Sequence, residues 1–478
     1  MSASAKAVAF RRLTHRALSL GAVKTFDHAT QFLLPVVLTR CLDAATFGEY
    51  RLLWLIVGTV MTLATLNMVG GLFFFLPRSD ARGKRLYIHQ TMLFLAASGL
   101  VCGALVGPWN PLLPAAAAQM AQYGWLIPAF ISLWVAAILL DWLPTIDERI
   151  RWQAYVTGTI SVLRMTVVAA AAWFTGELRA ILWALLAFVL VKLALLLYYV
   201  HRHHGLGRPW LERAAFRGQF SHCAPFGVSN ALYALRAQTD QWVAASLFAL
   251  SSFAAFSVAA IVGQVVHILR QSVMEAFMPT MSRMHAGGDV RGLMAMNSRA
   301  NAMVGTALYP LLALAFAFAE DIISLVYTAA YVEAAPVMRV YVVGMIAMVI
   351  EVGSVVLLLR QGPFALRITA LALIVSVALS WSGAHWFGLA GAAAGSVSAI
   401  YLDRTLLLRR ISRLTGIAPR DLQQWRELAR LLAAAAACGL LAWFLVNQFL
   451  DGAAHLVRLA AGATVLFLAY VPIWRLTR

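Results

Sequence analysis

Charged residues are scarce in this sequence: they make up 12% of its 478 residues, whereas hydrophobic residues make up 62%. Soluble globular proteins carry about 25% charged residues. The mean hydropathy of +0.78 is also too high for a chain that folds in water. A helix crosses a bilayer with about 20 apolar residues, so this chain can cross many times with short loops between. The composition excludes a soluble protein and predicts an all-α, multi-pass membrane protein.

Cysteine is scarce as well. The four cysteines lie far apart, mostly within apolar runs, and no Cys-x-x-Cys pair occurs. This spacing predicts neither a disulfide framework nor a metal site, and no cofactor is expected. The basic N-terminus is followed by a helix with polar interruptions rather than by an apolar core and a small-residue cleavage site. No cleaved signal peptide is therefore expected.

Long apolar runs are what the sequence does contain, and fourteen of them are long enough to span a bilayer. The expected spans are 19–40, 51–76, 86–107, 120–141, 153–174, 179–200, 221–248, 252–280, 298–318, 335–359, 364–386, 388–408, 428–448 and 456–474.

The basic residues support this number of spans. Of the 38 Lys and Arg residues, 28 fall in the termini and alternate connecting segments, and only 4 fall in the opposite set. Cytoplasmic loops collect Lys and Arg, so both termini are predicted to be cytoplasmic. The same rule explains the net charge of +18 without a nucleic-acid partner.

Two short turns between expected spans resemble each other. Phe47 and Tyr50 follow the first span, and Phe253 and Phe256 occupy the same places after span seven, at an offset of 206 residues. Both six-helix units start on the inside, which predicts two parallel repeats. The expected domains are an N-terminal lobe (1–200), a cytoplasmic basic linker (201–220), a C-terminal lobe (221–413) and two additional helices (425–478).

The linker contains the run His-Arg-His-His at 201–204, followed by Trp210. A His-rich run can bind a metal ion. A basic segment at the membrane interface is the favoured interpretation, because Trp and Arg gather at the lipid headgroups.

Four segments carry a resemblance to a known family. The segment LTRCLDAATFGEYRLLWLI at 38–56 resembles the first-hairpin signature of Wzx-type polysaccharide flippases, in the multidrug/oligosaccharidyl-lipid/polysaccharide (MOP) exporter superfamily. Three more agree in order: TDQWVAASLFALSSFAAFSVAA at 239–260 with MPTMSR at 278–283, DIISLVYTAAYVEAAPVMRVY at 321–341, and FGLAGAAAGSVSAIY at 387–401. One departure is Ala254, where the family often has Gly.

The resemblance implies a V-shaped, two-lobe transporter of the bacterial inner membrane rather than an enzyme. Its expected cargo is an undecaprenyl-pyrophosphate-linked oligosaccharide, the repeat unit of O-antigen or exopolysaccharide. Alternating access would move it from the cytoplasmic to the periplasmic leaflet. The expected partners are this glycan, membrane lipids, and the polymerase and export machinery of the same pathway, with no nucleic acid.

Polar and ionisable residues inside spans are the best site candidates, because each is costly in hydrocarbon and normally faces a cavity or a partner. The residues expected to line a cationic substrate cavity are Lys24, Gln31, Asn67, Arg164, Arg236, Gln264, His267, Arg270 and Gln271. Those expected to couple transport to a proton or a sodium ion are Asp27, Asp240 and Glu351.

Two pairs of these residues have an alternative interpretation. Lys24 with Asp27, and Arg236 with Asp240, are spaced to neutralise each other on one helix. They either line the cavity or hold helices together. Arg164 and Arg270 have no obvious acid nearby on their own helices and are predicted to contact phosphate.

Three further charges lie in or near the ends of spans. Lys192 and Asp141 are each placed near an inner membrane end, where Lys192 can snorkel to the interface. Glu351 lies deeper in span ten. It is either a coupling-ion site or the buried partner of a cation.

Several other functions remain as alternatives. A flippase for lipid II, the peptidoglycan precursor, would share the fourteen helices and the cationic residues. A drug/cation antiporter would favour an acidic cavity. A membrane polysaccharide polymerase or ligase would need a large periplasmic loop, whereas every outside loop here is short, and no P-loop or DxD motif occurs.

Overall fold

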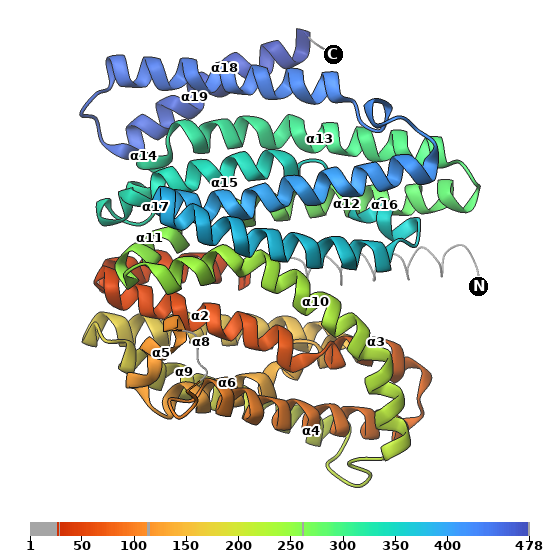
Figure 1. Ribbon diagram of the computed structural model, residues 1–478. Coiled ribbons are helices and arrows are strands. Elements are labelled where there is room, and N and C mark those ends of the chain that lie inside the picture. Colours follow the sequence, from red (N-terminus) through yellow and green to blue (C-terminus); the bar gives the residue numbers. More distant parts are fainter. Residues whose placement is uncertain (1–25, 28, 112–114, 261, 477–478) are drawn as a thin grey trace. The chain divides into compact units, whose positions relative to one another are not determined.

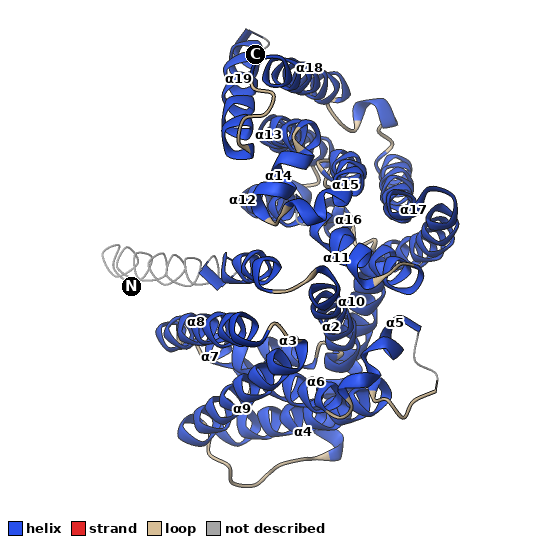
Figure 2. Ribbon diagram, turned by 90° about the vertical axis from the view of Figure 1, so that its left-hand side faces the viewer, coloured by secondary structure: helices blue, strands red, loops and turns tan. Residues whose placement is uncertain are grey.

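The computed structural model describes residues 26–27, 29–111, 115–260 and 262–476, and every regular element in these ranges is a helix. Figure 2 shows the helices as blue ribbons joined by short loops. A helix satisfies its own backbone hydrogen bonds, which hydrocarbon cannot do, so an apolar chain of this kind folds into helices. The expected all-α architecture is confirmed.

The chain divides into two compact units, residues 1–234 and 235–478. The division falls inside one long helix, α10 (Arg213–Leu247), beyond the expected linker 201–220. The two units are described separately below as unit 1 and unit 2.

Unit 1 is a helical bundle in which α4 packs on α6, and α9 packs on both α6 and α8 (Figure 1). Its first described helix is Ala29–Cys41. The main helices that follow are α2 (Ala44–Thr65), α3 (Met68–Phe75), α4 (Ala81–Val106), α6 (Leu126–Ala137), α7 (Leu143–Ile146), α8 (Ile150–Thr175), α9 (Leu178–His203) and the first part of α10.

Unit 2 is a second bundle, in which α13 packs against α12 and α18, and α15 packs against α17. After the end of α10, its helices are α11 (Leu250–Ala259), α12 (Val262–Ala286), α13 (Val290–Ala317), α14 (Ala319–Val326), α15 (Ala335–Met348), α16 (Gly353–Leu358), α17 (Gly362–Thr415), α18 (Trp425–Phe449) and α19 (His455–Leu476).

Within the described residues, ten helices are long and apolar enough to cross a membrane. One of them, α17, contains both expected spans 364–386 and 388–408, because the chain turns at Gly388 with φ +63°. The expected spans 221–248 and 252–280 coincide with α10, α11 and α12, whose polar residues lower their hydropathy. The chain is thus a multi-pass membrane protein.

Two breaks inside expected spans bear on the candidate site, and the periodicity of the sequence did not predict them. Span 51–76 divides into α2 and α3 at Leu66 and Asn67, both with left-handed backbone (φ 40° and 59°). Gly227 of α10 packs directly on this break, since a Cβ atom at Gly227 would lie 2.5 Å from the Leu66 backbone. Span 335–359 divides into α15 and α16 around Glu351.

The two turns that suggested a repeat have the same surroundings. Helix α2 begins at Ala44 and α11 begins at Leu250, which keeps the offset of 206 residues. Phe47 and Phe253 are both completely buried, as is Ala254, the position that departs from the family pattern. The small residue lets the second turn pack tightly in its unit.

The His-rich linker is held by specific contacts. His204 Nε2 lies 2.7 Å from Asp147 Oδ2, and the Tyr199 hydroxyl donates to the same oxygen at 2.7 Å. Arg85 Nε donates to the His204 carbonyl oxygen at 2.7 Å. Burial acts to raise the pKa of Asp147, but the hydrogen bonds and positive charges around it outweigh burial and lower that pKa.

The second half of the linker is also packed on α4. The Trp210 ring stacks on His89 with a centroid distance of 4.2 Å. The metal alternative gains no support, since the described residues contain no group of three or more His, Cys, Asp or Glu side chains that could hold a metal ion.

Candidate functional site

In unit 1 the candidate site is a cluster around Asp27, built from two helices. Ser161 Oγ of α8 donates to Asp27 Oδ1 at 2.5 Å, and Arg164 Nη2 lies 3.5 Å from the same oxygen. Gln31 Nε2 donates to Asp27 Oδ2 at 2.8 Å. Ser161 and Arg164 are three residues apart, so one face of α8 presents both to the carboxylate. The structure brings together three predicted residues: Asp27, Gln31 and Arg164.

This geometry gives Arg164 an acidic partner that the sequence alone did not show. The sequence shows no acid nearby on its own helix, yet Asp27 supplies one from a helix more than a hundred residues earlier. The side chains of Arg164 and Asp27 are 14% and 27% exposed, so solvent screens the attraction between their charges only in part. Lys24, the other predicted partner of Asp27, lies outside the described residues.

Unit 1 contains a second ion pair. Lys192 Nζ of α9 donates to Asp141 Oδ2 at 2.7 Å and lies 4.9 Å from the centroid of the Trp134 ring. The Lys192 side chain is 5% exposed and the Asp141 side chain 37%. A carboxylate and an aromatic face thus neutralise Lys192 inside the bundle.

In unit 2 the candidate site is a buried group of two cations around one carboxylate. Arg236 Nη1 of α10 lies 3.9 Å from Asp403 Oδ1, and Arg404 Nη1 lies 3.9 Å from Asp403 Oδ2. Asp403 and Arg404 are both on α17. The three side chains are only 9–15% exposed. Arg270 of α12 and Glu351 also act electrostatically on Arg404.

The two contacts to Asp403 are ionic rather than hydrogen-bonded, because N–H···O bonds in proteins are 2.7–3.2 Å long. Arg404 Nε is buried without a hydrogen-bond partner among the described residues. Two guanidinium groups share one carboxylate, so this group of three residues carries a formal charge of +1. A buried cationic site with such a donor is suited to a singly or doubly charged oxyanion.

Asp240, predicted to pair with Arg236 on the same helix, has other partners. Its side chain is almost completely buried, at 2% exposure. Tyr341 of α15 donates its hydroxyl to Asp240 Oδ2 at 2.8 Å, the Ser396 hydroxyl of α17 bonds to the carboxylate, and the Gln241 amide donates to Oδ1 at 2.8 Å. Asp240 thus ties α10 to α15 and α17.

Glu351 lies in the break between α15 and α16, not inside a continuous helix as the sequence suggested. Its Oε1 accepts from the amides of Gly353 (2.6 Å) and Ser354 (3.2 Å), which caps α16. Its carbonyl oxygen accepts from Asn297 and Asn301 of α13 at 3.0 and 3.2 Å. These contacts satisfy the backbone groups that a helix break frees.

The remaining predicted residues lie mainly on α12 and at the break after α2. His267 and Gln271 are exposed on α12, and Asn67 is half-buried with its side chain packed against Gly70. The side chain of Gln264 lies outside the described part of the structure.

Sequence reasoning missed Asp403, Arg404 and Tyr341. Arg404 was assigned to a cytoplasmic segment, although the expected span 388–408 already included it. An adjacent Asp-Arg pair inside an apolar helix is the signal that could have found two of the three. Tyr341 gives no such signal, because a tyrosine in a span is also typical of packing.

Comparisons with known proteins place the chain in a family. The family described as polysaccharide biosynthesis protein matches residues 37–336, which is more than half of the chain. A search of curated proteins found no match.

The fold is similar to those of solved transporters. The lipid II flippase MurJ, in an inward closed conformation, has a TM-score of 0.70 at 11% identity, and the alignment covers 96% of this chain and 99% of that one. An inward-facing multidrug resistance MATE family transporter of the MOP superfamily has a TM-score of 0.62 at 12% identity, covering 82% and 96%. A Vibrio cholerae MATE transporter, VcmN, has a TM-score of 0.52 at 16% identity, covering 88% and 100%.

These likenesses concern the fold, and the family match concerns the sequence. The predicted fold is confirmed, and it is the fold of MurJ and of the MATE transporters. The chain belongs to the polysaccharide biosynthesis protein family.

Proposed function

We propose that this protein is a flippase for an undecaprenyl-pyrophosphate-linked oligosaccharide, the repeat unit of an O-antigen or exopolysaccharide. It moves the headgroup from the cytoplasmic to the periplasmic leaflet by alternating access. The family match to polysaccharide biosynthesis supports the glycan cargo, and the transporter fold supports movement across the membrane.

The observation that carries the proposal is the group formed by Arg236, Asp403 and Arg404. The lipid tail of such a cargo stays in the bilayer, but its pyrophosphate cannot enter hydrocarbon without a charged partner. Two nearly buried guanidinium groups on one carboxylate supply a net positive charge, and Arg404 Nε is a buried donor without a hydrogen-bond partner among the described residues. Arginine binds phosphate oxygens through two parallel hydrogen bonds, which strengthens such a contact.

Asp403 has a specific role in this proposal. Without cargo it keeps the two arginines from repelling each other. When phosphate arrives it competes with the carboxylate for the same donors, and the long 3.9 Å ion pairs are weaker competitors than direct hydrogen bonds. Release on the far side then restores the Asp403 contacts.

Coupling to a proton or sodium ion belongs to the same proposal, through Asp27 or Asp240. Both carboxylates lie within helices and each receives hydrogen bonds from a neighbouring helix, so a change of protonation alters helix packing. Glu351 is the weaker candidate because its carboxylate caps α16.

The proposed setting is the bacterial inner membrane, with both termini in the cytoplasm. The polymerase and export machinery of the pathway would take the cargo after release. The remaining predicted cavity residues, Gln31, Asn67, His267, Arg270 and Gln271, are proposed to contact the headgroup.

The test uses cells that depend on this protein for a surface polymer. Arg236→Ala and Arg404→Ala are expected to reduce the polymer at least about tenfold, since each removes a charge-assisted phosphate contact. The lipid-linked repeat unit should accumulate in the inner leaflet. Arg420→Ala is the matched control, because Arg420 is in unit 2 with its side chain 86% exposed. Normal export by both variants at wild-type protein levels would refute the cationic site.

A flippase for lipid II is the second candidate, and the similarity to MurJ over 96% of this chain favours it. Depletion distinguishes the two: loss of a surface polymer supports the first proposal, and accumulation of peptidoglycan precursor with cell lysis supports the second. A drug/cation antiporter is less compatible with the surplus positive charge around Asp403.

A further inference from the structure

The first part of α10 has two unlike faces. Its residues Cys223 and Gly227 face the bundle of unit 1: a Cβ atom on Gly71 of α3 would lie 2.2 Å from Cys223 Sγ, and one on Gly227 would meet the Leu66 backbone. The other face carries His222, Phe226, Asn230 and Tyr233, all of them exposed. These four residues lie within about 80° of arc at 100° per residue.

The composition of the exposed face is unusual for a helix in contact with hydrocarbon. Phe226 and Tyr233 are 59% and 51% exposed, and the other two residues of the face, His222 and Asn230, are polar. An exposed amide and imidazole are costly against lipid tails. Aromatic rings that alternate with hydrogen-bonding groups suit a ligand that is itself both apolar and hydroxylated.

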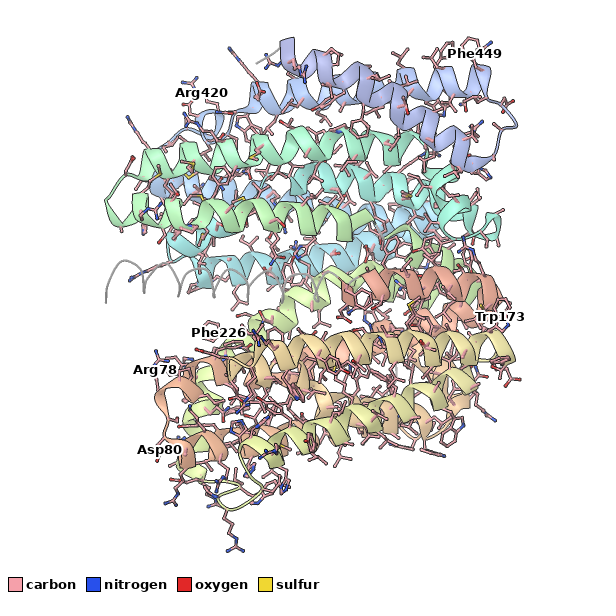
Figure 3. The ribbon with its side chains drawn as sticks, turned by 180° about the vertical axis from the view of Figure 1, so that it is seen from behind. Arg78, Asp80, Trp173, Phe226, Arg420 and Phe449 are labelled. Carbon is pink, nitrogen blue, oxygen red and sulfur yellow. The ribbon has the colours of Figure 1, made fainter. Side chains whose placement is uncertain are left out.

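At the His222 end of this face, Phe74 of α3 and Arg78, which follows α3, add a cationic stack. The Phe74 ring lies parallel to the His222 ring with a centroid distance of 4.6 Å, and His222 in turn contacts Phe226. The Arg78 guanidinium lies 4.0 Å from the Phe74 ring centroid and donates to the Phe74 carbonyl oxygen at 2.7 Å. Figure 3 shows Arg78 and Phe226 at the same end of the molecule.

This face, defined as Phe74, His222, Phe226, Asn230 and Tyr233, is held rigidly. Helix α3 approaches α10 closely where Gly71 faces Cys223, and α10 approaches the break after α2 where Gly227 faces Leu66. A rigid aromatic surface loses little conformational entropy when a ligand binds.

We propose that this face binds the sugar rings of the lipid-linked oligosaccharide on its way into the transporter. Sugar rings present a face of C–H groups, which packs on aromatic rings, and a rim of hydroxyl groups, which bond to amides and imidazoles. The inference rests on the proposed function and names residues for the glycan part of the same cargo.

The test compares two ligands on the purified full-length protein in nanodiscs. One is radiolabelled undecaprenyl pyrophosphate, which has no sugar, and the other is the lipid-linked oligosaccharide extracted from cells that lack the transporter. Phe226→Ala is expected to weaken binding of the oligosaccharide about tenfold, the effect of losing one well-packed aromatic contact. It should leave binding of the sugar-free carrier unchanged, and Phe226→Tyr should retain oligosaccharide binding.

Val228→Ala is the matched control, because Val228 is 49% exposed on α10 but lies outside the arc of the four residues. An equal loss for both ligands in Phe226→Ala would show that the face binds lipid, and no loss for either would show that it binds nothing. Both results overturn the inference while the wild-type protein still binds its ligands. If the wild-type protein binds neither ligand, the proposed function fails as well.

Discussion

The two units neutralise their buried charges in different ways. In unit 1, Asp141 and Lys192 form a matched pair, one acid to one cation at 2.7 Å. In unit 2, Asp403 is shared by Arg236 and Arg404 at 3.9 Å each. A matched pair leaves nothing for a ligand and serves packing. A carboxylate shared by two arginines leaves a net positive charge that a ligand can neutralise. By this difference we distinguish ion pairs that serve packing from charges that are candidates for binding.

The largest expected effect follows from removing the shared carboxylate. Asp403→Asn leaves two nearly buried guanidinium groups facing each other and should lower the free energy of unfolding by about 3–5 kcal/mol. Millimolar pyrophosphate should restore much of the loss, because a ligand that binds only the folded state stabilises it. Thermal unfolding in detergent, with and without pyrophosphate, measures both. Equal responses of Asp403→Asn and wild-type protein to pyrophosphate would contradict the binding role.

Variants of the Asp141–Lys192 pair in unit 1 should lose stability, and pyrophosphate should not restore it. Asp141→Asn strands Lys192, which is 5% exposed, and should cost about 3 kcal/mol. Lys192→Met should cost less, since the Asp141 side chain is 37% exposed and can be hydrated. The same unfolding assay compares the two variants. If pyrophosphate restored the stability of Asp141→Asn, the proposed difference between the charges of the two units would be wrong.

A smaller effect is expected at the close contact of α10 with the break after α2. In Gly227→Ala the new Cβ atom would lie 2.5 Å from the Leu66 backbone, so the helices must separate at a cost of about 1–3 kcal/mol. Gly158→Ala on α8 is the control, because a Cβ there meets nothing within 4 Å. It should be neutral or slightly stabilising, since Ala favours a helix over Gly. Equal stability of the two variants would show that the contact at Leu66 is not tight.

The smallest expected effect concerns Asp147, whose pKa is lowered. Its contribution to stability is complete above the ordinary carboxyl pKa of about 4 and is lost as pH falls through the lowered folded-state pKa. Unfolding of the wild-type protein should therefore become easier as the pH falls below about 4, more than in Asp147→Asn. Melting temperatures between pH 3 and pH 7 test this. Parallel profiles for both proteins would exclude a role for the Asp147–His204 contact.

Much of the fold could be predicted because hydropathy and charge are read along the chain. The apolar runs predicted where the helices lie, and the offset of 206 residues predicted equivalent places for Phe47 and Phe253. The structure places both of them, buried, in the first turn of a helix. The helix breaks at Leu66 and at Glu351 could not be found in this way, since both runs remain apolar across the break. They depend on packing by Gly227 and on hydrogen bonds from distant asparagines.

Several residues of the candidate site could be predicted from the sequence, but the ion pairs that they form could not. Asp27, Arg164 and Arg236 stood out because ionisable residues are rare in spans. Their pairing could not be predicted, because Arg164 meets Asp27 and Arg236 meets Asp403 across more than a hundred residues of sequence. Local spacing can propose only partners one helical turn away.

By itself the sequence determined that this protein lives in the membrane, that it is made of helices, and which residues are too polar to face lipid. These are properties of single segments, set by transfer from water to hydrocarbon. Only the tertiary structure decided which acid meets which cation. Asp403 is left between two arginines, and Lys192 with an acid of its own, because three-dimensional packing sets the distances between remote segments.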